Sequence, residues 1–147
     1  LYRKARALPG IKKILIAYDG SEAADKAYLH AVDLAGKYGA DLRGLAVASP
    51  PEFAEDVETE AILESAQEHY EKQFVSLQEQ AAAQGFQPRF EIAVGHPAEQ
   101  IIYHAEEDGV DLIVMGHRGK TFLQRWLLGS VTKRVISYAH CTVMVVR

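Results

Sequence analysis

The sequence predicts an α/β fold in which a doubly wound, five-stranded parallel sheet with the strand order 3-2-1-4-5 carries helices on both faces. Segments typical of strands and helices alternate along the chain, which is the pattern of parallel sheets with right-handed crossovers. The candidate strands are short, nearly unbroken apolar runs, as expected for strands buried on both faces. With 147 residues, 48% of them hydrophobic and 24% charged, the chain fits one globular domain.

The first strand is expected at residues 14–18, which are all hydrophobic. Ser21 is the expected N-cap of the first helix, because a serine hydroxyl can accept a hydrogen bond from a first-turn amide. Glu22 and Asp25 complement the positive end of this helix. Alanines at helical spacing give the helix a smooth face for the sheet, and glycines mark its end.

The second strand is expected at residues 41–48, where two prolines stop it. A long polar helix follows at about residues 55–84, and its thin apolar stripe indicates that half of it is exposed. A third strand is expected at residues 90–94. The next helix, residues 98–107, has Pro97 where a first helical residue would sit.

The glycine spacing after the fourth expected strand, residues 110–115, is the most informative local pattern. Gly116 and Gly119 follow the strand, nine residues separate Gly119 from Gly129, and Ser130 is the expected N-cap of the last helix. Glycines let a ligand approach the backbone without interference from a Cβ atom, and the N–H groups of a helix start attract phosphate. The pattern predicts a phosphate-binding site. The alternative is that the glycines only form turns.

The strand order brings a second candidate residue to the same site. If the order is 3-2-1-4-5, the strand order reverses between the first and fourth strands, and ligands of such sheets bind at this point, at the carboxyl ends of the strands. Asp19 directly follows the first strand and so faces Gly116. Its carboxylate suits a ribose hydroxyl or a magnesium-bound water; alternatively, Asp19 helps to cap the helix at Ser21. Thr132, in the first turn of the last helix, can point its hydroxyl into the site.

Three segments resemble the universal stress protein family. They are the pattern G-x2-G-x9-G-[S/T] within MGHRGKTFLQRWLLGSVTKRVI, which is closed by CTVMVVR, the opening segment KKILIAYDGS and the turn GHPAE. The likeness covers residues 11–147, which we expect to form a universal stress protein domain. Residues 1–10 have no place in the family pattern and are expected to be a leader, a linker or a disordered arm.

The resemblance implies the ATP-binding branch of that family, an adenine nucleotide alpha-hydrolase-like fold and a regulatory or stress-response role. The expected ligand is ATP with Mg or Mn bridging its phosphates, and no residue is assigned a catalytic role. A homodimer is also expected, in which the apolar last strand, residues 142–146, pairs with its copy as an uncovered edge strand. The nucleotide site is expected to comprise Ala17, Tyr18, Asp19, Val47, Met115, Gly116, Arg118, Gly119, Gly129, Ser130, Val131 and Thr132.

Other functions fit the sequence less well. Slow ATP hydrolysis, or autophosphorylation at Ser130 or Thr132, stays open, although the Walker sequence G-x-x-x-x-G-K-[ST] is absent. A receiver domain needs further acids beside Asp19, but Asp19 stands alone at the exit of the first strand. A flavin-binding protein would place its phosphate loop after the first strand, where this chain has the acidic residues Asp19 and Glu22. His117 lies in the glycine turn, but the histidines lack the spacing of metal ligands, so no metal site is expected.

Composition and charge restrict the class of protein and the compartment that the sequence favours. The net charge of −4, from 16 basic and 20 acidic residues, argues against nucleic-acid binding. No apolar run approaches the ~20 residues of a membrane helix. The single cysteine, Cys141, is expected to be a core residue. One cysteine and no signal peptide together indicate a cytoplasmic protein.

Overall fold

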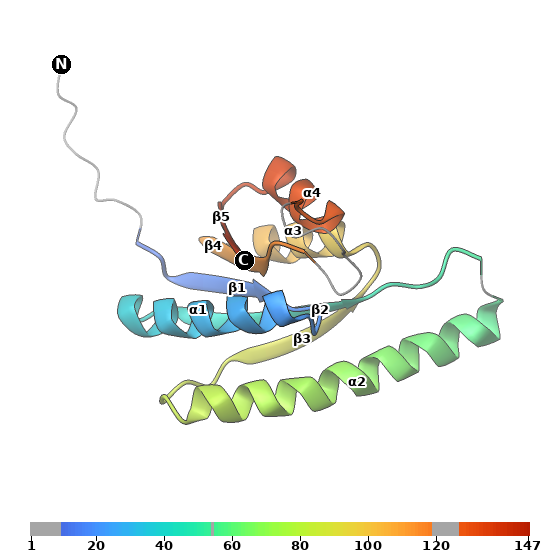
Figure 1. Cartoon of the computed structure of the whole chain (residues 1–147), viewed down its shortest axis with the longest axis horizontal. Helices are drawn as coiled ribbons and strands as arrows, with labels where there is room; N and C mark the ends of the chain where they lie inside the picture. Colours follow the sequence, from blue (N-terminus) through green and yellow to red (C-terminus); the bar gives the residue numbers. More distant parts are fainter. Residues whose placement is uncertain (1–9, 54, 119–126) are drawn as a thin grey trace, which may run out of the picture.

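The computed structural model describes residues 10–53, 55–118 and 127–147, where strands and helices alternate as predicted (Figure 1). The predicted leader, except for Gly10, and Gly119 of the predicted site lie outside the described residues. The described elements are β1 (Lys13–Ala17), α1 (Glu22–Tyr38), β2 (Asp41–Ala48), α2 (Asp56–Ala82), β3 (Arg89–Val94), α3 (Pro97–Glu107), β4 (Leu112–Gly116), α4 (Ser130–Tyr138) and β5 (Thr142–Val146).

The sheet has the predicted order, β3-β2-β1-β4-β5, and every neighbouring pair of strands is parallel. Helices α1 and α2 cover one face, and α3 and α4 cover the other (Figure 1). The central strand β1 pairs with both β2 and β4, so successive strands are added on one side of β1 up to β3 and on its other side from β4 onward. The fold class and strand order predicted from the sequence are therefore confirmed.

The two faces of the sheet hold separate hydrophobic cores, because side chains alternate along a strand. In β1, Ile14 and Ile16 pack in the core beneath α1 and α2, whereas Leu15 and Ala17 pack in the core beneath α3 and α4. All four are buried. This double burial explains the unbroken apolar run that the sequence shows at the first strand.

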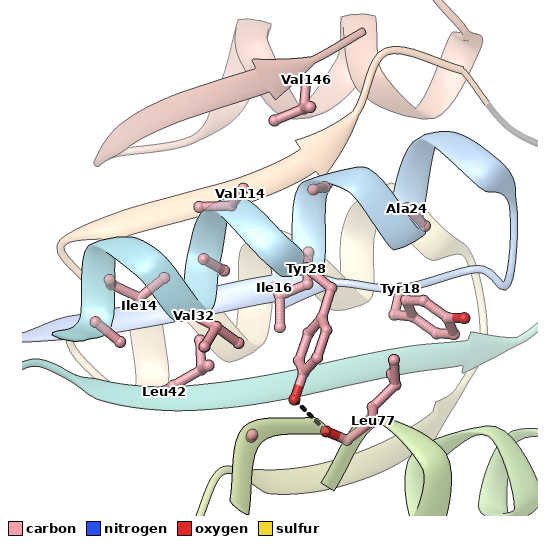
Figure 2. Packing of buried hydrophobic residues seen from close by; sticks show 14 of the residues in the cluster. Ile14, Ile16, Tyr18, Ala24, Tyr28, Val32, Leu42, Leu77, Val114 and Val146 are labelled. Carbon is pink, nitrogen blue, oxygen red and sulfur yellow. Dashed lines mark hydrogen bonds between the residues drawn. The ribbon is translucent and has the colours of Figure 1, made fainter. Parts of the chain in front are cut away.

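Helix α2 is anchored only by its C-terminal half. Its buried residues are Phe74, Leu77 and Ala81. Tyr28 of α1 donates a hydrogen bond from its hydroxyl to the carbonyl oxygen of Leu77 at 2.6 Å, which joins the two helices of this face (Figure 2). The predicted half-exposed character of this helix is confirmed.

Candidate functional site

The described residues of the predicted site line one cavity of about 680 Å³ at the carboxyl ends of β1, β2 and β4. This volume lies in the range of about 300–1,000 Å³ that is typical of small-molecule pockets. In register, Ala17 at the end of β1 pairs with Leu45 of β2 and Met115 of β4, and β2 continues to Ala48. The cavity is lined by Ala17, Tyr18, Asp19, Val47, Met115, Gly116, Arg118, Gly129, Ser130, Val131 and Thr132 among the predicted residues.

Gly116 is needed for helix packing rather than for backbone conformation. A Cβ atom at this position would lie 2.7 Å from the Cβ of Ala23 and 2.9 Å from its backbone carbon. The N-terminus of α1 therefore approaches β4 as closely as it does because residue 116 has no side chain. The sequence interpretation gave this space to a ligand, but α1 fills it, although Gly116 still lines the cavity.

Gly129 lies at the end of the segment that connects β4 to α4. Its N–H donates to the carbonyl oxygen of His117 at 2.8 Å, and a Cβ atom here would lie 3.2 Å from the Cα of Arg118. Gly129 is extended, with φ −64° and ψ 156°, and its carbonyl accepts from Lys133 at 3.0 Å. Gly129 is thus the N-cap of α4 and Ser130 its first helical residue, so the prediction that Ser130 is the N-cap was wrong by one residue.

The N-terminus of α4 opens into the cavity. Glycine at the N-cap offers no side-chain acceptor for the first-turn N–H groups, and Ser130, Val131 and Thr132 all line the cavity. Unpaired N–H groups and the helix dipole make such an end attractive to anions. This is the feature that the glycine spacing predicts.

The Thr132 hydroxyl serves the fold. Thr132 is buried, and its Oγ1 donates to the carbonyl oxygen of Gly116 at 2.9 Å, which ties the start of α4 to the end of β4. From the sequence, this hydroxyl was a candidate to point into the site; in the structure it donates its proton to the backbone carbonyl of Gly116 instead. Ser130, in contrast, is exposed at the cavity.

Asp19 contributes to the first turn and to the cavity at the same time. Its Oδ1 accepts a hydrogen bond from the backbone N–H of Ser21 at 2.9 Å, and the Ser21 hydroxyl accepts from Ala24 at 3.1 Å as the predicted N-cap of α1. Both interpretations of Asp19 are therefore compatible. Among the described residues that line the cavity, Asp19 is the only acidic one.

The negative charge of Asp19 acts on two tyrosines that line the cavity, Tyr18 and Tyr70. Burial and a 2.6 Å hydrogen bond from the Tyr18 hydroxyl to Asp25 raise the pKa of Tyr18 far above its ordinary value. Burial, followed by the negative charge of Asp19, raises the pKa of Tyr70. Both phenols stay protonated near neutral pH; the Tyr18 hydroxyl uses its proton on Asp25, whereas the Tyr70 hydroxyl can act as a hydrogen-bond donor in the cavity.

Tyr70 is the most informative lining residue that sequence reasoning missed. It comes from α2, and its ring stacks on Phe74 with a centroid distance of 6.3 Å. Its only signal in the sequence was a place in the apolar stripe of the long helix, which does not show what the helix contacts. The other lining residues that were missed are Ser21, Ala24, Leu45, Ser49, Pro97 and Ile101.

No metal centre is formed by the described side chains alone, since they contain no group of three His, Cys, Asp or Glu that could hold an ion. His117 is buried and its Nδ1 lies 3.3 Å from the carbonyl oxygen of Val146. Cys141 is half-buried beside the α3–α4 core, and burial raises the pKa of its thiol. Within the described ranges, no helix has the length and apolar content needed to cross a bilayer.

Known proteins of the same fold are similar to the chain over nearly its whole length. Universal stress protein MJ0531 of Methanocaldococcus jannaschii is 38% identical over 143 residues, which are 92% of this chain and 82% of that protein. Universal stress protein UspA from Lactobacillus plantarum matches with a TM-score of 0.89 at 28% identity, over 95% of this chain and 100% of that one. The structure of MJ0577, also from Methanocaldococcus jannaschii, matches with a TM-score of 0.85 at 33% identity, over 92% and 95%.

Two more distant structures share the fold and contain nucleotides. One is a universal stress protein in complex with cAMP (TM-score 0.64, 24% identity, 95% of this chain and 98% of that one). The other is from Archaeoglobus fulgidus in complex with dAMP (TM-score 0.66, 19% identity, 92% and 98%). At these identities the likeness establishes the fold alone. The sequence profile of the universal stress protein family matches residues 10–147, and the chain belongs to that family.

Proposed function

We propose that this protein binds ATP in the cavity between the ends of β1, β2 and β4 and acts as a nucleotide-dependent regulatory module in a stress response. One observation carries the proposal. The N-terminus of α4, whose N-cap Gly129 has no side chain, opens into the same cavity as an apolar wall from the sheet. An adenine nucleotide needs both surfaces, one for its phosphates and one for its base.

The phosphates belong at the start of α4. The backbone N–H groups of Ser130, Val131 and Thr132 and the positive end of the helix dipole supply donors and a favourable potential there. Arg118 also lines this part of the cavity and carries the positive charge that a triphosphate requires.

The base belongs against the apolar wall. Ala17, Val47, Met115 and Ile101 line the cavity from three strands and α3, which suits a flat, mostly apolar ring. Asp19, which also lines the cavity, is assigned to a ribose hydroxyl or to a magnesium-bound water.

A divalent cation fits this arrangement as a companion of the phosphates. Mg²⁺ is usually held by one or two carboxylates together with substrate phosphates and waters. Asp19 supplies one carboxylate, and the described side chains form no metal cage of their own. When bound with ATP, the ion would neutralise part of the phosphate charge.

The ligands of related proteins support an adenine nucleotide. The structures with cAMP and dAMP share this fold, and both ligands contain adenine and phosphate. ATP is preferred for this chain because the glycine spacing from Gly116 to Ser130 resembles that of the family's ATP-binding branch.

The test is binding of ATP measured by thermal unfolding. At an ATP concentration 100-fold above Kd, in the presence of Mg²⁺, ligand linkage adds ~2.7 kcal/mol of stability. For a domain of this size the melting temperature should rise by roughly 5–10 °C. Inorganic phosphate and GTP are the controls. No shift with ATP would contradict the proposal, and an equal shift with phosphate alone would reassign the site to another phosphoester.

Hydrolysis of the bound ATP is expected to be slow. Phosphoryl transfer to water needs a group that positions the attacking water. Among the described cavity-lining residues there is no histidine, and Asp19, the one carboxylate, is bonded to the backbone of Ser21. Turnover should therefore stay far below the ~1–100 s⁻¹ of kinases, measured by phosphate release. Turnover within that range would favour the ATPase alternative.

A further inference from the structure

The N-terminal half of α2 extends beyond the sheet and keeps an apolar stripe uncovered. Figure 1 shows α2 continuing past the end of β3. The first buried residue of α2 is Phe74, so none of its residues 56–73 is buried. Leu63 and Tyr70, which continue the buried stripe at helical spacing, are only half-buried.

A groove lies between this half of α2 and the ends of β2 and β3. It is a cavity of about 330 Å³, with an apolar floor formed by Ala48, Leu63, Ile92 and Val94. Val94 is 54% exposed even though it belongs to a strand. Close by in the chain, Phe53 is 95% exposed. Leu63 and Ile92 are half-buried and Ala48 is buried, so Val94 and the partly exposed Leu63 and Ile92 supply the apolar surface that a partner could cover.

One edge of the groove is a row of carboxylates. Asp56, Glu60 and Glu64 line it at four-residue spacing, so they follow one ridge of the helix. None of the three forms an ion pair within the described part of the molecule. From residue 52 to residue 71 the sequence has no Lys or Arg, and its acids are Glu52, Glu55, Asp56, Glu58, Glu60, Glu64, Glu68 and Glu71.

We propose that this groove is the docking site for an amphipathic helix of a partner protein, with Lys or Arg along one side of its apolar stripe. Apolar side chains of the partner would cover Leu63, Ile92 and Val94, and its cations would meet the carboxylate row. Charge complementarity selects this occupant, because a neutral or acidic helix would meet three unpaired carboxylates. A helix in an apolar groove, read through side chains at three- and four-residue spacing, is a common recognition mode.

The test uses a fluorescein-labelled peptide of leucine and lysine at helical spacing and measures its binding to the full chain by fluorescence anisotropy at physiological ionic strength. A peptide with glutamate in place of lysine is the control. The lysine peptide should bind saturably and the glutamate peptide should not. Absence of saturable binding by the lysine peptide would overturn the proposal.

Matched variants locate the binding site. Glu60→Gln with Glu64→Gln should weaken binding by about fivefold to tenfold, since an exposed ion pair contributes up to ~1 kcal/mol. Glu58→Gln with Glu79→Gln changes the net charge equally on the same helix, away from the carboxylate row and outside the groove lining. Equal weakening by both pairs would show attraction to net charge only and would overturn the proposal.

The apolar floor is tested at constant charge. Leu63→Ser should weaken binding by about tenfold, because it removes the apolar contact. Val75→Ser, at a 54% exposed position of α2 outside the groove, should leave the affinity unchanged. Unchanged affinity in Leu63→Ser would overturn the proposal. Light scattering of the free wild type and of the Glu60/Glu64 variant should give the same mass; a lower mass for the variant would assign the groove to a second copy of the chain instead.

Discussion

Two glycines of the same sequence pattern differ in what they do. At Gly116 a Cβ atom would overlap the backbone of α1, whereas at Gly129 it would press on the Arg118 backbone beside the cavity. Neither Gly116 nor Gly129 has a positive φ. Both are therefore required because neighbouring backbone lies close to them, and not because they adopt a left-handed conformation.

These contacts predict different effects of the two alanine substitutions. Gly116→Ala should cost about 1–3 kcal/mol of unfolding free energy, as overpacking of a core does. Gly129→Ala should cost less, because its neighbour needs to shift by only a few tenths of an ångström. It should weaken ATP binding by about tenfold, since the displaced backbone carries Arg118. Urea unfolding and titration calorimetry measure the two quantities; an unaltered ATP affinity in Gly129→Ala would assign this glycine to loop closure alone.

At the scale of elements, the hydrogen bond between α1 and α2 fixes where the long helix lies. The Tyr28 side chain is fully buried, and burial raises its pKa from its ordinary value near 10 to about 12. The folded state therefore keeps a phenol proton that the unfolded state releases between pH 10 and 12. The associated stability is complete below pH 10 and is lost as the pH rises towards 12.

Tyr28→Phe tests this contact. Below pH 10 the variant should lose about 1 kcal/mol of unfolding free energy, because the hydrogen bond to Leu77 is gone. Between pH 10 and 12 the stability of the wild type should fall more steeply than that of the variant, so the difference should shrink. Urea unfolding followed by circular dichroism measures both. Parallel pH profiles would mean that the phenol is accessible to water in the folded protein.

Helix α2 also connects two regions of the surface. Tyr70 lines the nucleotide cavity, and Gln67, one turn earlier, lines the groove of the proposed docking site. The Tyr70 ring stacks on Phe74, and Phe74 stacks in turn on Phe90 with ring centroids 4.6 Å apart, so a row of aromatic rings leads from the cavity into the core. The single helix α2 thus contributes to both regions, and its buried residues all lie from Phe74 onward.

At the scale of the whole molecule, β5 is an edge of the sheet, and the predicted homodimer through this strand stays a prediction. The carbonyl of Val146 accepts from the N–H of His117, so the peptide groups of Val146 face β4. Because successive residues of a strand direct their peptide groups to opposite edges, those of Val145 face away from β4. An edge with such exposed groups favours pairing with another chain. The sequence also allows an alternative, in which the apolar segment around Trp126 folds over this edge and leaves a monomer; Trp126 lies outside the described residues.

Val145→Pro separates dimerisation from folding. It removes a donor from the free edge, where proline is tolerated, and should shift a dimer of twice the 16.3 kDa chain mass towards monomer with little loss of stability. Met144→Pro is the contrasting variant, because its N–H faces β4, and it should destabilise the sheet itself. Light scattering and thermal unfolding report the two effects. A wild-type mass of one chain at micromolar concentration would contradict the dimer.

Much of the fold could be read from local features of the chain. Unbroken apolar runs indicated the strands, helical periodicity and the Ser21 cap indicated the helices, and their alternation indicated a parallel sheet. The strand order 3-2-1-4-5 was a hypothesis that alternation alone does not determine, because doubly wound sheets occur with more than one order. The glycine spacing then indicated which strand exit and which helix start belong together. These features depend on neighbouring residues and on the handedness of crossovers, so they are visible without coordinates.

Contacts between distant segments were set by packing. The tight approach of α1 to Gly116, the use of the Thr132 hydroxyl on the Gly116 carbonyl and the entry of Tyr70 into the cavity all join elements separated by long stretches of sequence. The same holds for the uncovered half of α2, whose stripe looks continuous in the sequence but is buried only where the sheet lies beneath it. Periodicity shows that a helix has an apolar face; how far the sheet extends determines how much of that face it can cover.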